Sequence, residues 1–185
     1  MSLQKETKAT ALQSAGTKSK IIDLRNRQRV CRLDLRLLRR MTRLLLQEYF
    51  QAKEFELGVH LVEAPEMTQL NEKFLRHAGS TDVITFDYTE QPERYSPSPY
   101  GMGRGPGEGE LAGEIFICIT EAQFQARRYR TELASEIVRY LIHGLLHLRG
   151  YDDKTAALRR KMKREEDRLL LQVAQRCSLK ELARL

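Results

Sequence analysis

The sequence predicts a single small domain of the α+β class, in which a mixed β-sheet of about four strands packs against helices. Strand-like and helix-like patterns both occur along the chain, but they do not alternate strictly, so a mixed sheet is favoured over a parallel one. The length of 185 residues, of which 41% are hydrophobic and 31% charged, suffices for one hydrophobic core without structural staples. The three cysteines are widely spaced and odd in number, which disfavours a disulfide framework and favours a reducing, cytoplasmic location.

Four segments have the residue patterns of strands. The first begins at Ile21 and becomes a linker before Leu33. Residues Phe55–Val62 (FELGVHLV) alternate with a period of two, as expected for a half-buried strand. Residues Ser80–Tyr88 (STDVITFDY) are rich in β-branched side chains, and we expect them to form a central strand. The segment Gly113–Thr120 (GEIFICIT) supplies the fourth strand.

Five segments have helical patterns. Asp34 can cap a helix that runs to about Tyr49, and Pro65 opens a second helix that passes through Phe74. The other three are expected over Glu121–Tyr129, from Thr131 or Leu133 to about Leu148, and from Lys154 to about Arg176. The last of these is long, basic and amphipathic.

The chain divides into one domain and its flanking segments. We assign residues 1–20, which are polar and lack an apolar core segment, to a flexible N-terminal tail rather than a secretory signal. The domain spans residues 21–176, and residues 177–185 form a C-terminal tail. Within the domain, residues 91–110 are rich in Pro, Gly and Ser, which predicts a mobile loop between two neighbouring strands. No apolar run approaches the length of a membrane span, so no membrane partner is expected.

The net charge of +7 is unevenly distributed along the chain. Residues 1–53 carry thirteen Lys and Arg against four Asp and Glu, whereas residues 54–113 carry four against eleven. Residues 114–185 are again basic, with fifteen against ten. Two basic ends around an acidic middle suit a polyanionic partner such as RNA, although arginine-rich, solvated helix faces would give the same count.

The segment HGLLHLRGYDD, residues 143–153, has the spacing of a metal site. On a helix, His143 and His147 lie one turn apart on the same face, as in the HxxxH helix of zincins. Gly150 ends the helix and lets the chain turn back, so that Asp152 or Asp153 returns to the histidine pair. Three ligands leave a fourth position open, which is the arrangement of a catalytic zinc site. Two ordinary histidines on a helix remain the alternative.

A peptidase of the zincin type is disfavoured by the residue that follows the first histidine. Zincins place a glutamate there as the general base, in the motif H-E-x-x-H. In this chain the position is Gly144, which has no carboxylate.

The same segment resembles the H-G-x-L-H-L-x-G-Y-D-H signature of the YbeY family of metal-dependent endoribonucleases. Four further segments are similar to family motifs in the same order: LNEKF to L-N-x-x-Y, STDVITFDY to T-D-V-L-S-F, LAGEIFICIT to L-G-D-I-x-I-S, and SEIVRYLIHG to R-E-L-x-x-L-x-V-H-G. The resemblance spans about residues 21–170. It implies an α+β fold in which a sheet is backed by helices and three histidines hold the metal.

Two positions depart from the family pattern. The third histidine of the signature falls on Asp153, and the arginine that follows the L-N-x-x-Y aromatic falls on Leu75, one position before Arg76. A carboxylate can complete a catalytic set with two histidines, so we expect His143, His147 and Asp153 to bind one divalent ion and to be the catalytic residues. Zn²⁺ is the favoured ion, and Mn²⁺ and Fe²⁺ remain alternatives because a carboxylate is a harder ligand. Arg76 is either a phosphate clamp for the substrate or a solvated arginine.

Several other polar residues have open assignments. Asp82 and Glu114 are either orienting residues behind the site or surface acids at strand ends. Glu136, two helical turns before His143, is a candidate partner for a basic side chain beneath the site. His60 and His77 have no ligand-like neighbours in the sequence, and we expect them to be structural or exposed.

The resemblance implies a single-strand-specific endoribonuclease that matures ribosomal RNA, at the 3′ end of the small-subunit RNA, and takes part in ribosome quality control. Its partners would then be ribosomal RNA and the small ribosomal subunit. Two alternatives stay open: a non-catalytic RNA-binding factor of ribosome assembly, and a metal-dependent hydrolase of another substrate such as a peptide. The sequence does not predict the oligomeric state.

Overall fold

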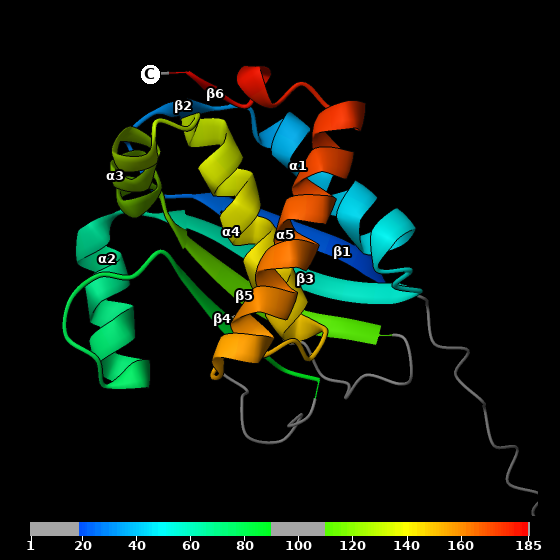
Figure 1. Cartoon of the computed structure of the whole chain (residues 1–185), viewed down its shortest axis with the longest axis horizontal. Helices are drawn as coiled ribbons and strands as arrows, with labels where there is room; N and C mark the ends of the chain where they lie inside the picture. Colours follow the sequence, from blue (N-terminus) through cyan, green and yellow to red (C-terminus); the bar gives the residue numbers. More distant parts are fainter. Residues whose placement is uncertain (1–18, 90–109, 185) are drawn as a thin grey trace, which may run out of the picture.

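A computed structural model describes residues 19–89 and 110–184, and its main element is a four-stranded mixed sheet. The strands are β1 (Lys20–Asn26), β3 (Glu54–Val62), β5 (Glu110–Cys118) and β4 (Val83–Asp87), in that order across the sheet. β1 and β5 both run parallel to β3, whereas β4 runs antiparallel to β5 (Figure 1). The predicted α+β class with a mixed sheet is therefore confirmed. Residues 1–18 of the expected tail (1–20) and residues 91–109 of the expected loop (91–110) lie outside the described residues. The last residues of these two segments, Lys20 and Glu110, instead begin strands β1 and β5.

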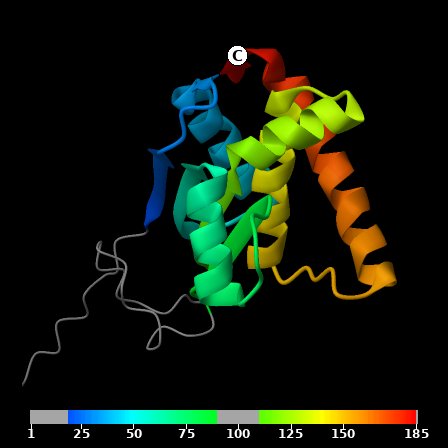
Figure 2. The same cartoon turned by 90° about the vertical axis from the view of Figure 1, so that its left-hand side faces the viewer.

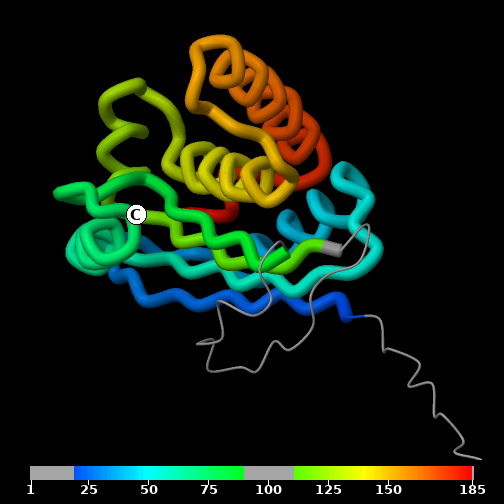
Figure 3. The backbone as a smooth tube through the Cα atoms, turned by 90° about the horizontal axis from the view of Figure 1, so that it is seen from below, coloured from blue at the N-terminus to red at the C-terminus, as the bar shows by residue number. Residues whose placement is uncertain are grey.

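Helices cover one side of this sheet and build the main core. α4 (Leu133–Leu148) lies between the sheet and α5 (Ala156–Arg176), as Figures 1 and 3 show. α1 (Leu35–Leu44), its continuation η1 (Leu45–Tyr49) and α3 (Ile119–Tyr129) complete this layer. Leu141, Ile142, Leu145 and Leu146 of α4 are all completely buried, so this helix is held on nearly all sides. The central position of α4 gives the residues at its C-terminal end a rigid support.

Two helix starts follow the predicted chemistry. The Asp34 side chain accepts a hydrogen bond of 2.9 Å from the main-chain N–H of Leu37, which caps α1 as expected. Pro65 stands in the first turn of α2 (Ala64–Leu70), which continues as η2 (Asn71–Leu75).

The predicted position of one strand is wrong. The segment Ser80–Tyr88 contains β4, which lies at an edge of the sheet, whereas the two central strands are β3 and β5. β-Branched and aromatic residues favour any pleated, half-buried surface, so their enrichment does not distinguish an edge from the centre. β4 is half-buried because α4 packs against it.

The segment assigned to a C-terminal tail, residues 177–185, contributes to the fold over its described part. It forms η3 (Leu179–Glu181) and β6 (Ala183–Arg184), and β6 pairs antiparallel with the short strand β2 (Arg32–Leu33). Cys177 and Leu182 are buried against the main core. This contact ties the end of α5 to the start of α1.

Candidate metal centre

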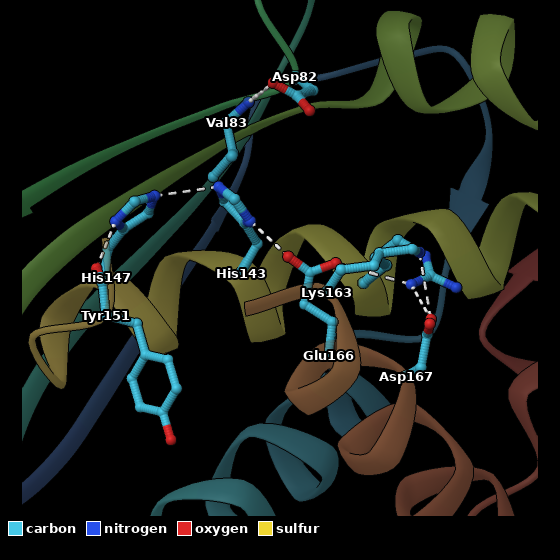
Figure 4. A network of polar contacts seen from close by, with 9 residues as sticks. Asp82, Val83, His143, His147, Tyr151, Lys163, Glu166 and Asp167 are labelled. Carbon is cyan, nitrogen blue, oxygen red and sulfur yellow. Dashed lines mark hydrogen bonds and ion pairs between the residues drawn. The ribbon is translucent and has the colours of Figure 1, made fainter. Parts of the chain in front are cut away.

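His143 and His147 lie on the last two turns of α4 and point toward each other. Their Nε2 atoms are 3.0 Å apart, and their ring planes are nearly perpendicular (Figure 4). Both histidines are partly exposed, while the apolar residues between them are buried in the core. The predicted one-turn spacing therefore places two imidazole nitrogens at one point at the edge of the core.

The chain reverses immediately after α4 and brings Asp153 to this point. Gly150 adopts a positive φ of 79°, and its N–H donates to the His147 carbonyl at 2.9 Å. The Asp152 carboxylate then accepts hydrogen bonds from the main-chain N–H groups of Asp153, at 2.7 Å, and Lys154, at 3.1 Å. As a result, one ligand atom each of His143, His147 and Asp153 lies within 4.8 Å of the others. Asp152 shapes the turn and is not part of this group.

The hydrogen bonds of the two imidazoles fix their tautomers. Nδ1 of His143 lies 2.6 Å from Oε1 of Glu166, and Nδ1 of His147 lies 3.1 Å from the main-chain oxygen of Tyr151. Both partners are acceptors, so each Nδ1 must carry a proton and donate it. Both Nε2 atoms of the neutral rings then present lone pairs to each other at 3.0 Å. That arrangement is repulsive unless a metal ion binds both lone pairs or one ring takes up a second proton.

The residues fit a divalent metal ion. Ligands held tetrahedrally at the usual Zn–N distance of about 2.0–2.1 Å are roughly 3.3 Å apart, close to the spacing of the two Nε2 atoms. Asp153 adds an anionic oxygen, and an acceptor behind each histidine is the usual outer support of metal-binding imidazoles. Two histidines and one carboxylate leave a position for a substrate or a water molecule.

Burial lowers the pKa values of both histidines, and the nearby carboxylates raise them. Burial lowers the pKa of His143, but the hydrogen bond and the charge of Glu166, helped by Asp82 and Asp153, outweigh it and raise that pKa above its usual value. The pKa of His147 is lowered by burial and by the neighbouring His143, which exceed the opposite effect of Asp153. His147 therefore keeps its neutral, ligand-competent form to lower pH than a free histidine.

Glu166 is a site residue that the sequence analysis missed. It projects from α5 toward His143 and is buried, with 7% of its surface exposed (Figure 4). Its second carboxylate oxygen lies 3.7 Å from Arg139. Glu166 shares the buried stripe of α5 with Met162, Leu169 and Val173. A glutamate on an otherwise apolar stripe was a signal of a buried, partnered charge that could have identified it.

Gly144 packs against the sheet and has no room for a side chain. A Cβ atom at this position would lie 2.7 Å from Cγ2 of Ile115 on β5. The position that carries the general base in zincins therefore faces the core here. This geometry agrees with the expectation that a peptidase mechanism of that type lacks its base.

A basic cavity adjoins the histidine pair. It has a volume of about 810 Å³, and its lining includes His143, Asp153 and Glu166 together with basic side chains of α5. These basic residues are Arg159, Arg160, Lys163 and Arg164. Figure 2 shows the loop from α4 to α5 crossing the bottom of the molecule, where α5 begins. Cations from the first half of α5 thus border an opening that leads to His143 and Asp153.

Arg76 occupies a different kind of position from the one expected of a phosphate clamp. It is exposed, ends η2 in a left-handed conformation with φ of 58°, and is not among the residues that line the cavity. Its role in substrate binding stays a prediction. His77, next to it, is exposed, as expected.

The remaining acidic and histidine candidates have distinct roles. Asp82 accepts a hydrogen bond from the main-chain N–H of Val83 at 3.0 Å at the start of β4, and its charge acts on His143 (Figure 4). Glu114 accepts a 2.7 Å bond from the Tyr88 hydroxyl and lies 3.2 Å from Nε2 of His60. His60 is buried and stacked on a neighbouring phenylalanine ring, so it is structural.

The prediction that Glu136 pairs with a basic side chain beneath the site is wrong. This buried carboxylate accepts a 2.6 Å hydrogen bond from the Thr131 hydroxyl, which precedes α4. It forms no ion pair with a basic side chain among the residues that the structure describes. A local turn hydroxyl satisfies Glu136 because α4 begins next to it, and no basic side chain is needed.

Known proteins share both the sequence pattern and the fold. The family model described as Endoribonuclease YbeY matches residues 23–174. A protein named Endoribonuclease YbeY from Elusimicrobium minutum is 35% identical over 67% of this chain and 78% of its own length. One of the same name from Chlorobium luteolum is 36% identical over 57% of this chain and 64% of its own length.

The structural comparison supports the architecture. The solution structure of a Thermotoga maritima protein matches 83% of this chain and 89% of its own with a TM-score of 0.54, at 22% identity. That likeness concerns the fold alone. The helices that the structure describes include none long and apolar enough to cross a membrane. The family match over residues 23–174 and the identity to the curated relatives show that this chain belongs to the YbeY endoribonuclease family.

Proposed function

We propose that this chain is a metal-dependent endoribonuclease that cleaves single-stranded RNA. Within that activity, we propose ribosomal RNA as the substrate, at the 3′ end of the small-subunit RNA, with a role in ribosome quality control in the cytoplasm. The observation that carries the proposal is the convergence of His143, His147 and Asp153 beside a basic cavity. The names of the curated relatives support RNA cleavage as the activity.

His143, His147 and Asp153 would hold one divalent ion, with Zn²⁺ favoured. When bound, such an ion supplies Lewis-acid activation of the phosphoryl group or of the attacking water. Glu166 accepts the Nδ1 proton of His143, which turns Nε2 of the neutral ring toward the ion, and the Tyr151 carbonyl does the same for His147. Both imidazoles therefore meet the ion in their ligand form without rearrangement.

The basic side chains of α5 would bind the RNA backbone. Arg160 and Arg164 lie one helical turn apart, line the cavity, and form no ion pair within residues 19–89 and 110–184. Guanidinium groups match phosphate oxygens with two parallel hydrogen bonds. They would hold the strand so that one phosphodiester group faces the histidine pair. Arg76 stays a candidate for a contact further along the strand.

The proposal is tested with purified protein on labelled single-stranded RNA, the matching duplex, and a peptide, each with and without a chelator. We expect chelator-sensitive cleavage of the single strand alone. His147→Ala should abolish this activity, whereas Asp152→Asn, which alters only the turn, is the matched control. Cleavage of the peptide would favour a hydrolase of another substrate. RNA binding without cleavage in any metal would favour a non-catalytic assembly factor.

A further inference from the structure

A second arginine-rich groove lies away from the metal centre, between α1 and the C-terminal end of α5. It has a volume of about 380 Å³, and its walls include Arg36, Arg39, Arg40, Arg43 and Arg176, with Glu48 as the acidic residue. Figure 1 shows α1 beside the upper part of α5, whereas the cavity at the metal centre adjoins the first half of α5. We name this feature the α1 groove.

Most of the positive charge in the α1 groove is not neutralised by the protein. Arg176 forms an ion pair with Glu48 at 3.3 Å, and Arg39 donates a hydrogen bond to the main-chain oxygen of Ile22 on β1. Arg36, Arg40 and Arg43 are exposed and form no ion pair with any residue that the structure describes. Three free guanidinium groups therefore border one concave surface.

These arginines are unfavourable for the helix that carries them. Arg36 and Arg40, and Arg40 and Arg43, are like charges at spacings of four and three residues, which repel each other on a helix surface. Arg36 also stands in the first turn of α1, which contains no acidic residue, so its charge opposes the helix dipole. Arg43, in the last turn of α1, is favourably placed for the helix dipole, but the repulsion among the three arginines remains. An external polyanion would offset this repulsion.

The geometry points to a second RNA-binding site, at which the α1 groove holds phosphates of the same single-stranded RNA outside the reaction centre; this inference rests on the proposed function. Arg160 at the cavity and Arg176 at the groove are sixteen residues apart on α5, or about 24 Å along the helix. At about 3.4 Å per nucleotide, a stacked strand reaches both with roughly seven nucleotides. The groove would thus select long RNA over short fragments.

A membrane surface is the less favoured occupant. A helix that binds at a bilayer surface must insert an apolar face beneath its basic face. The apolar face of α1 is already used, because Leu38, Met41, Leu45 and Leu46 of α1 and η1 are completely buried in the core. What remains outside is a polar, concave surface, which suits a phosphodiester backbone.

The test compares two triple variants with the same change in charge. In the first, Arg36, Arg40 and Arg43 are each replaced by Gln. In the control, Arg127, Arg128 and Arg130, which are exposed on and just after α3, are each replaced by Gln. Binding of labelled single-stranded RNAs of about 20 and about 3 nucleotides, long enough and too short to reach both sites, is measured against salt concentration. A chelator is present, so that the readout does not depend on cleavage.

We expect the groove variant to bind the long RNA up to roughly 100-fold more weakly near 0.1 M salt, with a salt slope shallower by about 2, because each lost phosphate contact on a single strand removes about 0.7. Binding of the short RNA should change little, and the control should keep most of its affinity. The melting temperature of the groove variant should be equal to or above that of the wild type, since repulsion has been removed. Reduced binding would then not reflect unfolding.

Equal losses in both variants would overturn the inference, because the effect would then be one of net charge. Unchanged binding of long RNA by the groove variant would also overturn it. So would a loss of binding to anionic vesicles or to polyglutamate without a loss for RNA, which would indicate a membrane or an acidic protein. If the groove variant loses RNA binding but the wild type cleaves no RNA with any metal, the proposed nuclease function is wrong and the RNA-binding role of the α1 groove is still supported.

Discussion

Removal of the Glu166 carboxylate should weaken the binding of a metal ion that Glu166 does not itself coordinate. Oε1 of Glu166 lies 2.6 Å from Nδ1 of His143, and the residue is 7% exposed, so water does not readily replace this acceptor. Loss of such an outer partner typically lowers metal affinity 10- to 100-fold, which corresponds to about 1.4–2.7 kcal/mol. Glu166→Gln keeps an acceptor oxygen and loses the charge, so we expect about tenfold. Glu166→Ala loses both and should approach 100-fold.

The assay is a competition titration of Zn²⁺ between the protein and a chromophoric chelator at constant pH. Asp167→Asn is the matched control, since Asp167 is adjacent in sequence and pairs with Arg139 at 2.6 Å and Lys163 at 3.2 Å, away from the histidines. We expect this variant to bind Zn²⁺ within about twofold of the wild type, because Asp167 is about half exposed and contacts neither histidine. An unchanged Zn²⁺ affinity of Glu166→Ala, or an equal loss of affinity in Asp167→Asn, would show that Glu166 does not support His143.

Three further outcomes are expected. Asp153→Ala should weaken metal binding in a chelator titration, because it removes a ligand. Asp153→His supplies a third imidazole and should retain metal binding. Equal affinity of the alanine variant and the wild type would exclude Asp153 from the site. Gly144→Ala should lower the free energy of unfolding in urea by about 1–3 kcal/mol, because the added Cβ would collide with the Ile115 side chain. An unchanged urea midpoint would show that Ile115 moves aside with no loss of stability. The hydrogen bond from His60, which outweighs burial, lowers the pKa of Glu114 below its usual 4.5, so its contribution to stability is present above about pH 4.5 and lost as the pH falls through the folded-state pKa. The Glu114→Gln protein should therefore lose stability less steeply in acid, and parallel acid-unfolding curves for it and the wild type would contradict this assignment.

Local patterns predicted those parts of the structure that short stretches of chain determine. The capping of α1 by Asp34 depends on residues within one turn. The convergence of His143, His147 and Asp153 depends on a helical repeat, a glycine at positive φ and a turn of a few residues. Each of these follows from backbone geometry and not from distant contacts.

Features that depend on distant contacts could not be read from the sequence in the same way. The edge position of β4 is set by its pairing with β5, across a long intervening segment. Glu166 meets His143 because α5 packs on α4, and the buried stripe of α5 shows that Glu166 is inside but not what it contacts. The arginines of α1 are visible in the sequence, but the groove that they form with Arg176 is not. That groove exists because the pairing of β2 with β6 holds the end of α5 near α1.

The central claim is that His143, His147 and Asp153 hold one divalent ion on which RNA cleavage depends. The most direct measurement adds Zn²⁺ stepwise to metal-free protein and follows bound metal and the cleavage rate of single-stranded RNA in the same samples. We expect the rate to rise in proportion to bound metal and to level off at one ion per chain. A protein carrying both His143→Ala and His147→Ala should show neither bound metal nor cleavage. A rate that is the same without metal, or a double variant that still cleaves RNA, would contradict it.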